Sequence, residues 1–232
     1  MELNNPSIQL GANMKKSKFT NVLIGILFTL AFLSIGVIAS LNFRFIYYLD
    51  VDILNIPKTS GYSKDVILEN YNALIDYNSP FYKGELNFPS LPASPNGIIH
   101  FQEVKAIFVS FYYIGLLSIL ALVGIIIYKH KKKEYRYLRV SAITVLVVPI
   151  ITAIGVALNF DATFVIFHKI FFRNDYWLFD PATDPVINIL PDTFFLHCLI
   201  VIILFIIVGS MILFSVSRIV DNRRRKSLLI KN

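Results

Sequence analysis

Four long apolar stretches restrict the fold more than any other feature of the sequence. They cover approximately residues 21–41, 104–128, 140–158 and 194–217. A helix needs roughly 20 consecutive apolar residues to cross the ~30 Å hydrocarbon core of a bilayer, and each stretch is about that long or longer. In lipid, a single spanning segment satisfies its own backbone hydrogen bonds only as a helix. The sequence therefore predicts an all-α integral membrane protein with four transmembrane helices.

The basic residues lie in the segments that share one side of such a membrane protein. The net charge is +7 at pH 7, and most Lys and Arg residues precede the first stretch, separate the second from the third, or follow the fourth. Cytoplasmic segments carry an excess of Lys and Arg. Both chain ends are therefore predicted in the cytoplasm (N-in, C-in), and this topology explains the charge without a nucleic-acid partner.

The same topology places two segments outside, residues 42–103 and 159–193, which are predicted to form a small extracellular cap. Residues 14–232 then make a single transmembrane domain. Residues 1–13 precede a second Met-Lys-Lys start and are treated as a candidate leader or tag. The alternative that the first span is a cleaved signal peptide is disfavoured, because its apolar run exceeds the usual length of about 7–15 residues.

The first outer segment contains one clear helix signal. Ser63 can cap a helix over residues 64–77, and Asn78-Ser79-Pro80 is predicted to end it. The prolines that follow predict an extended stretch that leads to His100 at the mouth of the second span. Apolar residues at helical spacing form one face of the predicted helix: Ile67, Tyr71, Leu74 and Ile75.

The second outer segment predicts an aromatic helix. Asp161 is the expected N-cap of a helix over residues 162–173. His168 lies seven residues from both Asp161 and Asp175, so the three share a face if the helix continues. With basic residues at its edge, such a helix suits the headgroup level of a membrane. Four phenylalanines form one stripe on it: Phe160, Phe164, Phe167 and Phe171.

The chain beyond this helix is dense in aromatic and acidic residues. These residues are Asp175, Tyr176, Trp177, Phe179 and Asp180. Asp184-Pro185 is predicted to be the N-cap and first residue of a short helix. Pro191-Asp192 is predicted to open the fourth span.

The four histidines differ in their surroundings. His130 lies in the cytoplasmic lysine run and His197 lies one turn into the fourth span, where solvation or an interfacial hydrogen bond accounts for them. His100 and His168 stand at the outer ends of apolar segments in different loops, so the fold can bring them together. An imidazole takes and gives protons near neutral pH, which suits a general acid–base pair. A purely structural role for both residues stays open.

Signatures of cofactor and nucleophile sites are absent from the sequence. It contains no Gly-x-Ser-x-Gly elbow, no glycine-rich phosphate loop and no dinucleotide fingerprint. A zinc site built from His100, His168 and His197 with Asp180 lacks the usual ligand spacing. The lone Cys198 cannot form a disulfide within the chain. We therefore expect no metal, no cofactor and no serine nucleophile.

Two basic residues near the outer region carry alternative interpretations. Lys105 lies inside the second span, where a charge is costly unless it reaches the interface or a partner. One interpretation is that it extends to lipid headgroups. In the other, Lys105 and Arg173 hold the acids of the site, or carbonyl or phosphate oxygens of a substrate.

Three segments resemble the lipoprotein intramolecular transacylase family, as does the four-span layout. They are His100-Phe101-Gln102-Glu103-Val104-Lys105, then Phe167-His168-x4-Arg173-Asn174-x2-Trp177-x-Phe179-Asp180-Pro181, and finally Pro191-Asp192-Thr193-Phe194-Phe195. The resemblance covers residue 14 to the C-terminus. The sequence departs from the family where an Arg-Glu pair commonly precedes the first histidine and an aspartate follows it. Pro95-Asn96-Gly97 and Glu103 stand at about those places.

The resemblance implies a bacterial cell-membrane enzyme that acts on diacylated lipoproteins. Such enzymes move the glyceryl sn-2 acyl chain to the α-amino group of the N-terminal cysteine, which gives a lyso-form lipoprotein. It also implies that His100 and His168 are catalytic and lie on the extracellular face. The aromatic residues could then confine the substrate, and Asp161, Asp175 or Asp180 could orient an imidazole. The alternatives are a non-enzymatic membrane adaptor and a metal-dependent membrane hydrolase.

Overall fold

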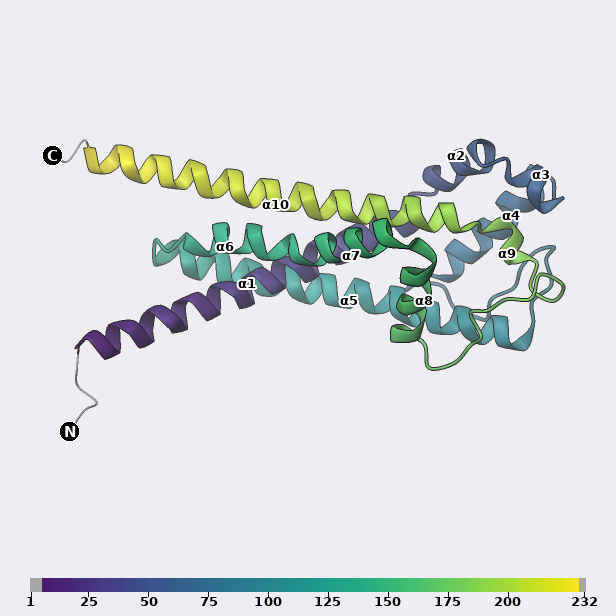
Figure 1. Cartoon of the computed structure of the whole chain (residues 1–232), viewed down its shortest axis with the longest axis horizontal. Helices are drawn as coiled ribbons and strands as arrows, with labels where there is room; N and C mark the ends of the chain where they lie inside the picture. The colour runs from purple at the N-terminus through teal and green to yellow at the C-terminus, as the bar shows by residue number, and fades with distance from the viewer. Residues whose placement is uncertain (1–5, 230–232) are drawn as a thin grey trace. The chain divides into compact units, whose positions relative to one another are not determined.

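A computed structural model describes residues 6–229 of the chain and the side chains of residues 18–227. All regular structure in this part is helical (Figure 1). The first five residues of the candidate leader lie outside it. The helices are α1 (Pro6–Asn42), α2 (Phe45–Ile53), α3 (Ile56–Ser60), α4 (Lys64–Tyr77), α5 (Pro95–Lys131), α6 (Arg136–Val145), α7 (Val147–Leu158), α8 (Phe160–Phe171), α9 (Val186–Ile189) and α10 (Asp192–Leu229).

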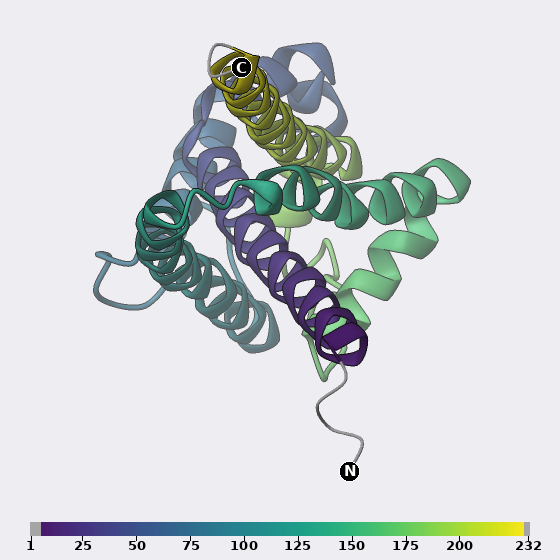
Figure 2. The same cartoon turned by 90° about the vertical axis from the view of Figure 1, so that its left-hand side faces the viewer.

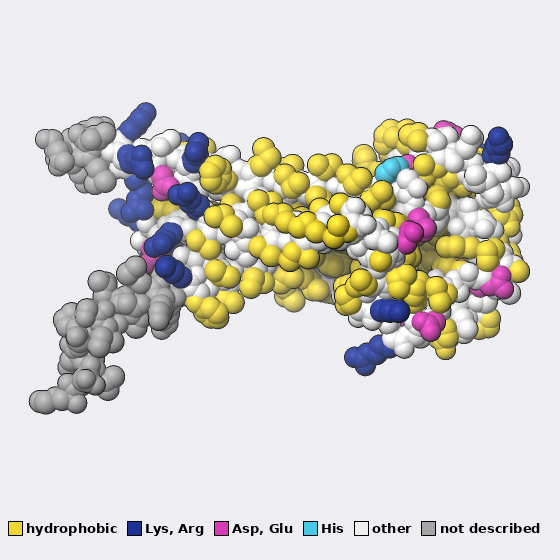
Figure 3. All heavy atoms as spheres, viewed as in Figure 1, with side chains coloured by type: hydrophobic (Ala, Val, Ile, Leu, Met, Phe, Trp, Pro, Cys, Tyr) yellow, Lys and Arg dark blue, Asp and Glu magenta, His cyan; other side chains and the backbone are white. Residues whose placement is uncertain are grey.

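In the described part of the chain, four helical segments are long and apolar enough to cross a membrane, in agreement with the predicted number of spans. They are Lys18–Asn42, Pro95–Lys131, Arg136–Leu158 and Asp192–Ser227. Hydrophobic side chains cover the visible faces of α6 and α10, as expected of helices that meet lipid tails (Figure 3). The chain is a multi-pass, membrane-integral, all-helical protein.

The second span begins earlier than the sequence predicted. Its helix, α5, starts at Pro95 rather than near residue 104. Proline is well tolerated in the first turn, where the missing N–H has no helical partner anyway. His100, predicted at the mouth of the second span, therefore lies inside α5, in its second turn.

The third span is interrupted between α6 and α7. Leu146 separates the two helices. Pro149 cannot donate a hydrogen bond to the carbonyl of Val145, and its ring crowds that carbonyl. A proline inside a long apolar run therefore breaks the helix without ending the span.

The chain divides into two compact units, each assembled from segments that are distant in the sequence. Unit 1 contains Met1–Leu33, Gly115–Ile151 and Leu204–Asn232, and unit 2 contains Ser34–Ile114 and Thr152–Ile203. Within unit 1, parts of α1, α6 and α10 lie side by side (Figure 2). Small residues allow this close packing: a Cβ on Gly25 would lie 2.7 Å from the Thr144 side chain, and one on Gly209 would lie 2.6 Å from the Phe32 ring.

Unit 2 holds a hydrophobic core that joins α2, α4, α9 and the start of α10. The Tyr47 and Tyr71 rings stack with centroids 3.7 Å apart, and Phe194 packs edge-on against both. The Tyr47 hydroxyl donates a 2.6 Å hydrogen bond to the Ile189 carbonyl. Each aromatic pair contributes about 0.5–1.5 kcal/mol beyond its buried area. This core holds together four elements from both ends of the chain.

The predicted helix at residues 64–77 is confirmed at both ends. The Ser63 hydroxyl accepts a 3.4 Å hydrogen bond from the Val66 N–H, and the helix ends before Asn78. The four residues predicted to share its apolar face are all buried. The extended, proline-containing stretch after it is also present, up to residue 94. Helices α2 and α3 were not predicted, because neither has a side-chain cap at its start.

Candidate active site

The aromatic helix α8 is present, but its N-cap is Asn159 rather than Asp161. The Asn159 backbone is extended, and its side-chain oxygen accepts a 2.9 Å hydrogen bond from the Ala162 N–H. An N-cap needs such a non-helical backbone, and Asp161 already lies inside the first turn. The predicted shared face of His168 and Asp175 is not formed, because the helix ends at Phe171. Helix α8 leaves the end of α7 at a steep angle (Figure 1, Figure 2).

His168 is held by the backbone of its own helix. Its Nδ1 lies 2.8 Å from the Phe164 carbonyl oxygen. A carbonyl only accepts hydrogen bonds, so Nδ1 carries the proton and the neutral ring has its lone pair on Nε2. The residue is 8% exposed, and burial lowers the pKa of its imidazole although the Phe164 hydrogen bond opposes this shift. His168 is therefore placed to be neutral, with Nε2 free to take a proton.

His100 lies next to His168 although the two come from α5 and α8. The ring centroids are 6.1 Å apart, so the structure brings the two predicted histidines together. Phe172 and Phe179 pack on the His100 ring with centroids at 4.7 and 5.4 Å, and Trp177 stacks on His168 at 4.6 Å. Both imidazoles are thus enclosed by aromatic rings that exclude water.

Glu103 completes a polar cluster one helical turn after His100. Its Oε1 accepts a 2.9 Å hydrogen bond from the Asn174 amide, and the Asn174 side-chain oxygen accepts one from the Tyr176 N–H at 3.1 Å. The sequence interpretation did not assign Asn174 to the site, although this residue is part of the motif that carries the family resemblance. Its amide ties the segment after α8 to α5.

Three buried polar atoms of this cluster have no hydrogen-bond partner in the described part of the chain. They are Nδ1 of His100, Oε2 of Glu103 and Nε1 of Trp177. Buried polar groups nearly always find a partner, and leaving one unpaired costs about 1–3 kcal/mol. The Glu103 atom is an acceptor and the Trp177 atom is a donor. Such a group of unpaired atoms is expected where a polar ligand binds.

Asp184 fixes the start of the helix that carries His100. It is 3% exposed, and its Oδ1 accepts a 2.7 Å hydrogen bond from the Ser94 N–H just before α5. A Cβ on Gly97 would lie 2.2 Å from this oxygen, so only glycine fits there. The short helix α9 is present as predicted, but Pro185 is its N-cap and the Asp184 side chain does not cap it. The helix dipole stabilises a carboxylate near a helix N-terminus, which explains why the Asp184 side chain lies at the start of α5.

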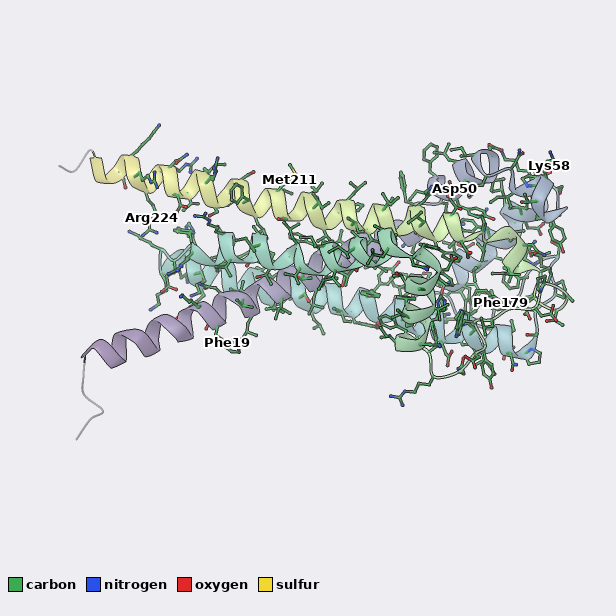
Figure 4. The ribbon with its side chains drawn as sticks, in the orientation of Figure 1. Phe19, Asp50, Lys58, Phe179, Met211 and Arg224 are labelled. Carbon is green, nitrogen blue, oxygen red and sulfur yellow. The ribbon has the colours of Figure 1, made fainter. Side chains whose placement is uncertain are left out.

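Phe179 contacts the same turns of α5. Its ring stacks on Phe101 with centroids 5.3 Å apart and meets His100 edge-on. Figure 4 shows its position beside the first turns of α5. Residues 172–184, which we call the strap, therefore cover both histidines and contact α5 through Phe172, Asn174, Phe179 and Asp184.

Several predicted supporting residues lie apart from the two imidazoles. Lys105 donates to the Tyr82 carbonyl at 3.1 Å and lies 4.2 Å from the Tyr77 ring centroid, so it anchors the first outer segment instead of holding acids of the site. Other predicted side chains are exposed: Asp161, Phe171, Arg173, Asp175 and Asp180. Phe167 is also exposed, but its ring packs edge-on against His168 with centroids 5.4 Å apart.

None of the three predicted aspartates orients an imidazole within the described residues. Asp180 accepts instead from the Ala182 N–H at 2.9 Å, in a local turn. Phe164 of the aromatic stripe does reach the site, with its ring 4.2 Å from that of His168. The backbone carbonyl of Phe164 has the orienting role that the sequence assigned to an aspartate.

His197 lies in a separate pair. Its Nδ1 is 2.8 Å from Oδ1 of the buried Asp50, which joins α10 to α2 (Figure 4). It does not join the other two histidines, so the zinc ligand set considered from the sequence is not assembled. Among the described residues, no group of three or more His, Cys, Asp or Glu side chains could hold a metal ion.

Comparison with known proteins gives consistent matches. A family model described as lipoprotein intramolecular transacylase Lit matches residues 22–195. A solved structure of the membrane-integral lipoprotein intramolecular transacylase Lit from Bacillus cereus is 38% identical, with a TM-score of 0.86 over 91% of this chain and 99% of that one. A search of curated proteins found no match.

Two further structures are variants of the same Bacillus cereus protein in which one histidine is replaced. The arginine variant is 38% identical with a TM-score of 0.81, and covers 95% of this chain and 98% of its own. The alanine variant is 36% identical with a TM-score of 0.82, and the match covers 95% of this chain and 99% of the variant. The likeness therefore extends over nearly the whole of each chain.

Proposed function

The chain belongs to the lipoprotein intramolecular transacylase family, and we propose that His100 and His168 are its general acid–base pair. It is accordingly an enzyme and not a membrane adaptor. The observation that carries the proposal is the placement of two buried imidazoles, from α5 and α8, with centroids 6.1 Å apart. Nδ1 of His100, Oε2 of Glu103 and Nε1 of Trp177 are unpaired there. Its substrate is a diacylglyceryl lipoprotein in the membrane.

The proposed reaction moves the sn-2 acyl chain within one substrate molecule. The nitrogen of the N-terminal cysteine attacks the ester carbonyl carbon, a C–N bond forms, and the bond from that carbon to the glyceryl oxygen breaks. Starting from the neutral amine, the nitrogen loses one proton and the glyceryl oxygen gains one. No water, cofactor or outside nucleophile is consumed, so positioning and proton transfer are what the enzyme supplies.

His168 is the better base of the pair. Its Nδ1 donates to the Phe164 carbonyl, which leaves the Nε2 lone pair for the proton of the attacking amine. Because burial lowers its pKa, the ring is neutral at pH 7 and can accept that proton. The proton taken up by His168 is then passed through His100 to the glyceryl oxygen, so both rings begin and end the reaction neutral.

The unpaired atoms of Glu103 and Trp177 can bind the amine and the ester carbonyl of the substrate. Oε2 of Glu103 can accept an N–H of the amine and hold it beside His168. The Nε1–H of Trp177 can donate to the ester carbonyl oxygen, on which negative charge develops during attack. The rings of Phe164, Phe172 and Phe179 limit access of water, which would hydrolyse the ester instead.

The site belongs on the outer face of the bacterial cytoplasmic membrane. Lys and Arg residues concentrate in segments of unit 1, and the positive-inside rule assigns those segments to the cytoplasm. Both histidines belong to the opposite, outer side in this topology. Mature lipoproteins present their lipidated cysteine on that outer face.

The test is mass spectrometry of the N-terminal peptide of a lipoprotein, which locates the acyl chain. His100→Ala and His168→Ala should each slow formation of the lyso form by at least about 10²-fold, because positioned proton transfer contributes about that much. His130→Ala is the matched control, since His130 is an exposed residue of unit 1. Full activity in both test variants would show that the histidines are structural.

A further inference from the structure

Two adjoining cavities in unit 1 have no part in the reaction proposed above. Their volumes are about 280 and 400 Å³, and they share Tyr135, Arg136 and Arg224 as lining residues. The larger one lies between α6 and α10. We call the two together the basic cavity.

The basic cavity carries more positive charge than its own acids can balance. Its charged lining residues are Lys129, Lys133, Glu134, Arg136, Arg139, Asp221 and Arg224. Glu134 is already paired with Lys129. No carboxylate among the described residues forms an ion pair with Arg136, Arg139 or Arg224. Three guanidinium groups, each able to bind phosphate oxygens with two N–H groups, are therefore left for an anion.

Other contacts hold the cavity walls in place. The Tyr135 hydroxyl lies 3.0 Å from Nδ1 of His130, and the Arg224 guanidinium lies 6.0 Å from the Tyr135 ring centroid. Figure 4 shows Arg224 pointing from α10 toward the start of α6. Figure 3 shows Lys and Arg side chains gathered over this end of α10 and over the turn that joins α5 and α6. His130, which has no role in the proposed reaction, thus supports the cavity.

An apolar wall continues from the arginines along α6. Arg136, Val140 and Ile143 follow one another at helical spacing and all line the larger cavity. Ile143 is 64% exposed, so its side chain is free to contact a ligand or lipid. On α10, Ser217, Asp221 and Arg224 face the same cavity at the same spacing. The cavity is thus basic at one end and apolar at the other.

We propose that the basic cavity binds the phosphate of an anionic phospholipid, with the glycerol and the start of an acyl chain along Val140 and Ile143. Arg136, Arg139 and Arg224 hold the phosphate, and Asp221 accepts from a headgroup hydroxyl. Basic pockets between helices at the cytoplasmic side recognise lipid headgroups in this way. A soluble phosphate would meet the same arginines but leave the apolar wall uncovered. The lipid would stabilise unit 1 and would not enter the reaction.

The experiment measures lipid binding to the purified full chain in detergent, by native mass spectrometry and thermal shift. The probes are phosphatidylglycerol, phosphatidylcholine and inorganic phosphate. Arg136→Gln and Arg224→Gln should each weaken phosphatidylglycerol binding about tenfold, because each removes one guanidinium group that forms charge-assisted hydrogen bonds with the phosphate. Arg225→Gln is the matched control, because it removes the same charge from the next residue of α10, which does not line the cavity.

Each of three results would overturn the proposal. Arg225→Gln could weaken binding as much as Arg224→Gln, which would indicate a diffuse charge effect. Phosphatidylcholine could bind as tightly as phosphatidylglycerol, or inorganic phosphate alone could give the full thermal shift. The unfolding temperatures of the lipid-free variants, which we expect to equal that of the unsubstituted chain, verify that they are folded.

Discussion

At the scale of single residues, the candidate site relies on aromatic rings and backbone groups more than on charged side chains. A backbone carbonyl orients His168, and no carboxylate among the described residues contacts either imidazole. Trp177 stacks on His168 at 4.6 Å while its Nε1 stays unpaired. The indole therefore has two separable features, a ring face that holds the base and an N–H that is free for the substrate.

Trp177→Phe separates these two features. Phenylalanine keeps an aromatic face against His168 but lacks the Nε1–H, so the unfolding temperature should change little. If the N–H donates to the ester carbonyl in the transition state, the rate of lyso-form formation should fall by about 10²-fold. The measurement is the initial rate on a diacylated lipopeptide, with Trp177→Ala as the variant that loses both features. An unchanged rate in Trp177→Phe would assign Trp177 a packing role only.

At the scale of elements, the strap determines where α5 begins and so where His100 stands. Asp184→Ala leaves the Ser94 N–H without its acceptor, which should lower the free energy of unfolding by about 1–3 kcal/mol. Gly97→Ala should act in the same direction, since its Cβ would overlap Asp184. Thermal unfolding and activity in detergent check both variants.

The control for these variants is Asp175→Ala, at an exposed strap residue, which should change the free energy of unfolding by less than about 0.5 kcal/mol. Equal effects of Asp184→Ala and Asp175→Ala would contradict this role.

The same elements show which features the sequence predicts and which it does not. Both ends of helix α4 were predicted correctly, because its N-cap, its apolar face and the residues that end it all lie within residues 63–80. The two histidines were found because each stands beside an apolar segment. The hydrogen bond from Ser94 to Asp184 joins residues 90 positions apart, and the one from Asn174 to Glu103 joins residues 71 apart. Such partners are chosen by tertiary packing, so the local pattern gave Asp184 the wrong capping role. The error at Asp161 is a local one, because Asn159, two residues earlier, has an equally suitable capping side chain.

At the scale of the whole molecule, the two units divide the chemistry of the chain. Unit 2 contains both histidines, the strap and the aromatic core, whereas unit 1 contains the basic cavity and the runs of Lys and Arg. The long helices contribute residues to both units, so this division does not follow the order of the sequence. A transacylase of lipoproteins needs its histidines on the face where the lipidated cysteine is presented. The predicted topology is thus a condition for the proposed function.

Cysteine labelling tests this topology in a background that carries Cys198→Ser. Lys58→Cys places a thiol on α3, in unit 2 (Figure 4), and Arg225→Cys places one near the end of α10, in unit 1. In intact cells, a membrane-impermeant maleimide should modify Lys58→Cys and leave Arg225→Cys unmodified until the cells are permeabilised, because Lys- and Arg-rich segments stay in the cytoplasm. The reverse pattern would place His100 and His168 on the cytoplasmic side. The enzyme could then act only on a lipoprotein whose cysteine had not yet left the cytoplasm, and the proposed substrate would have to be abandoned.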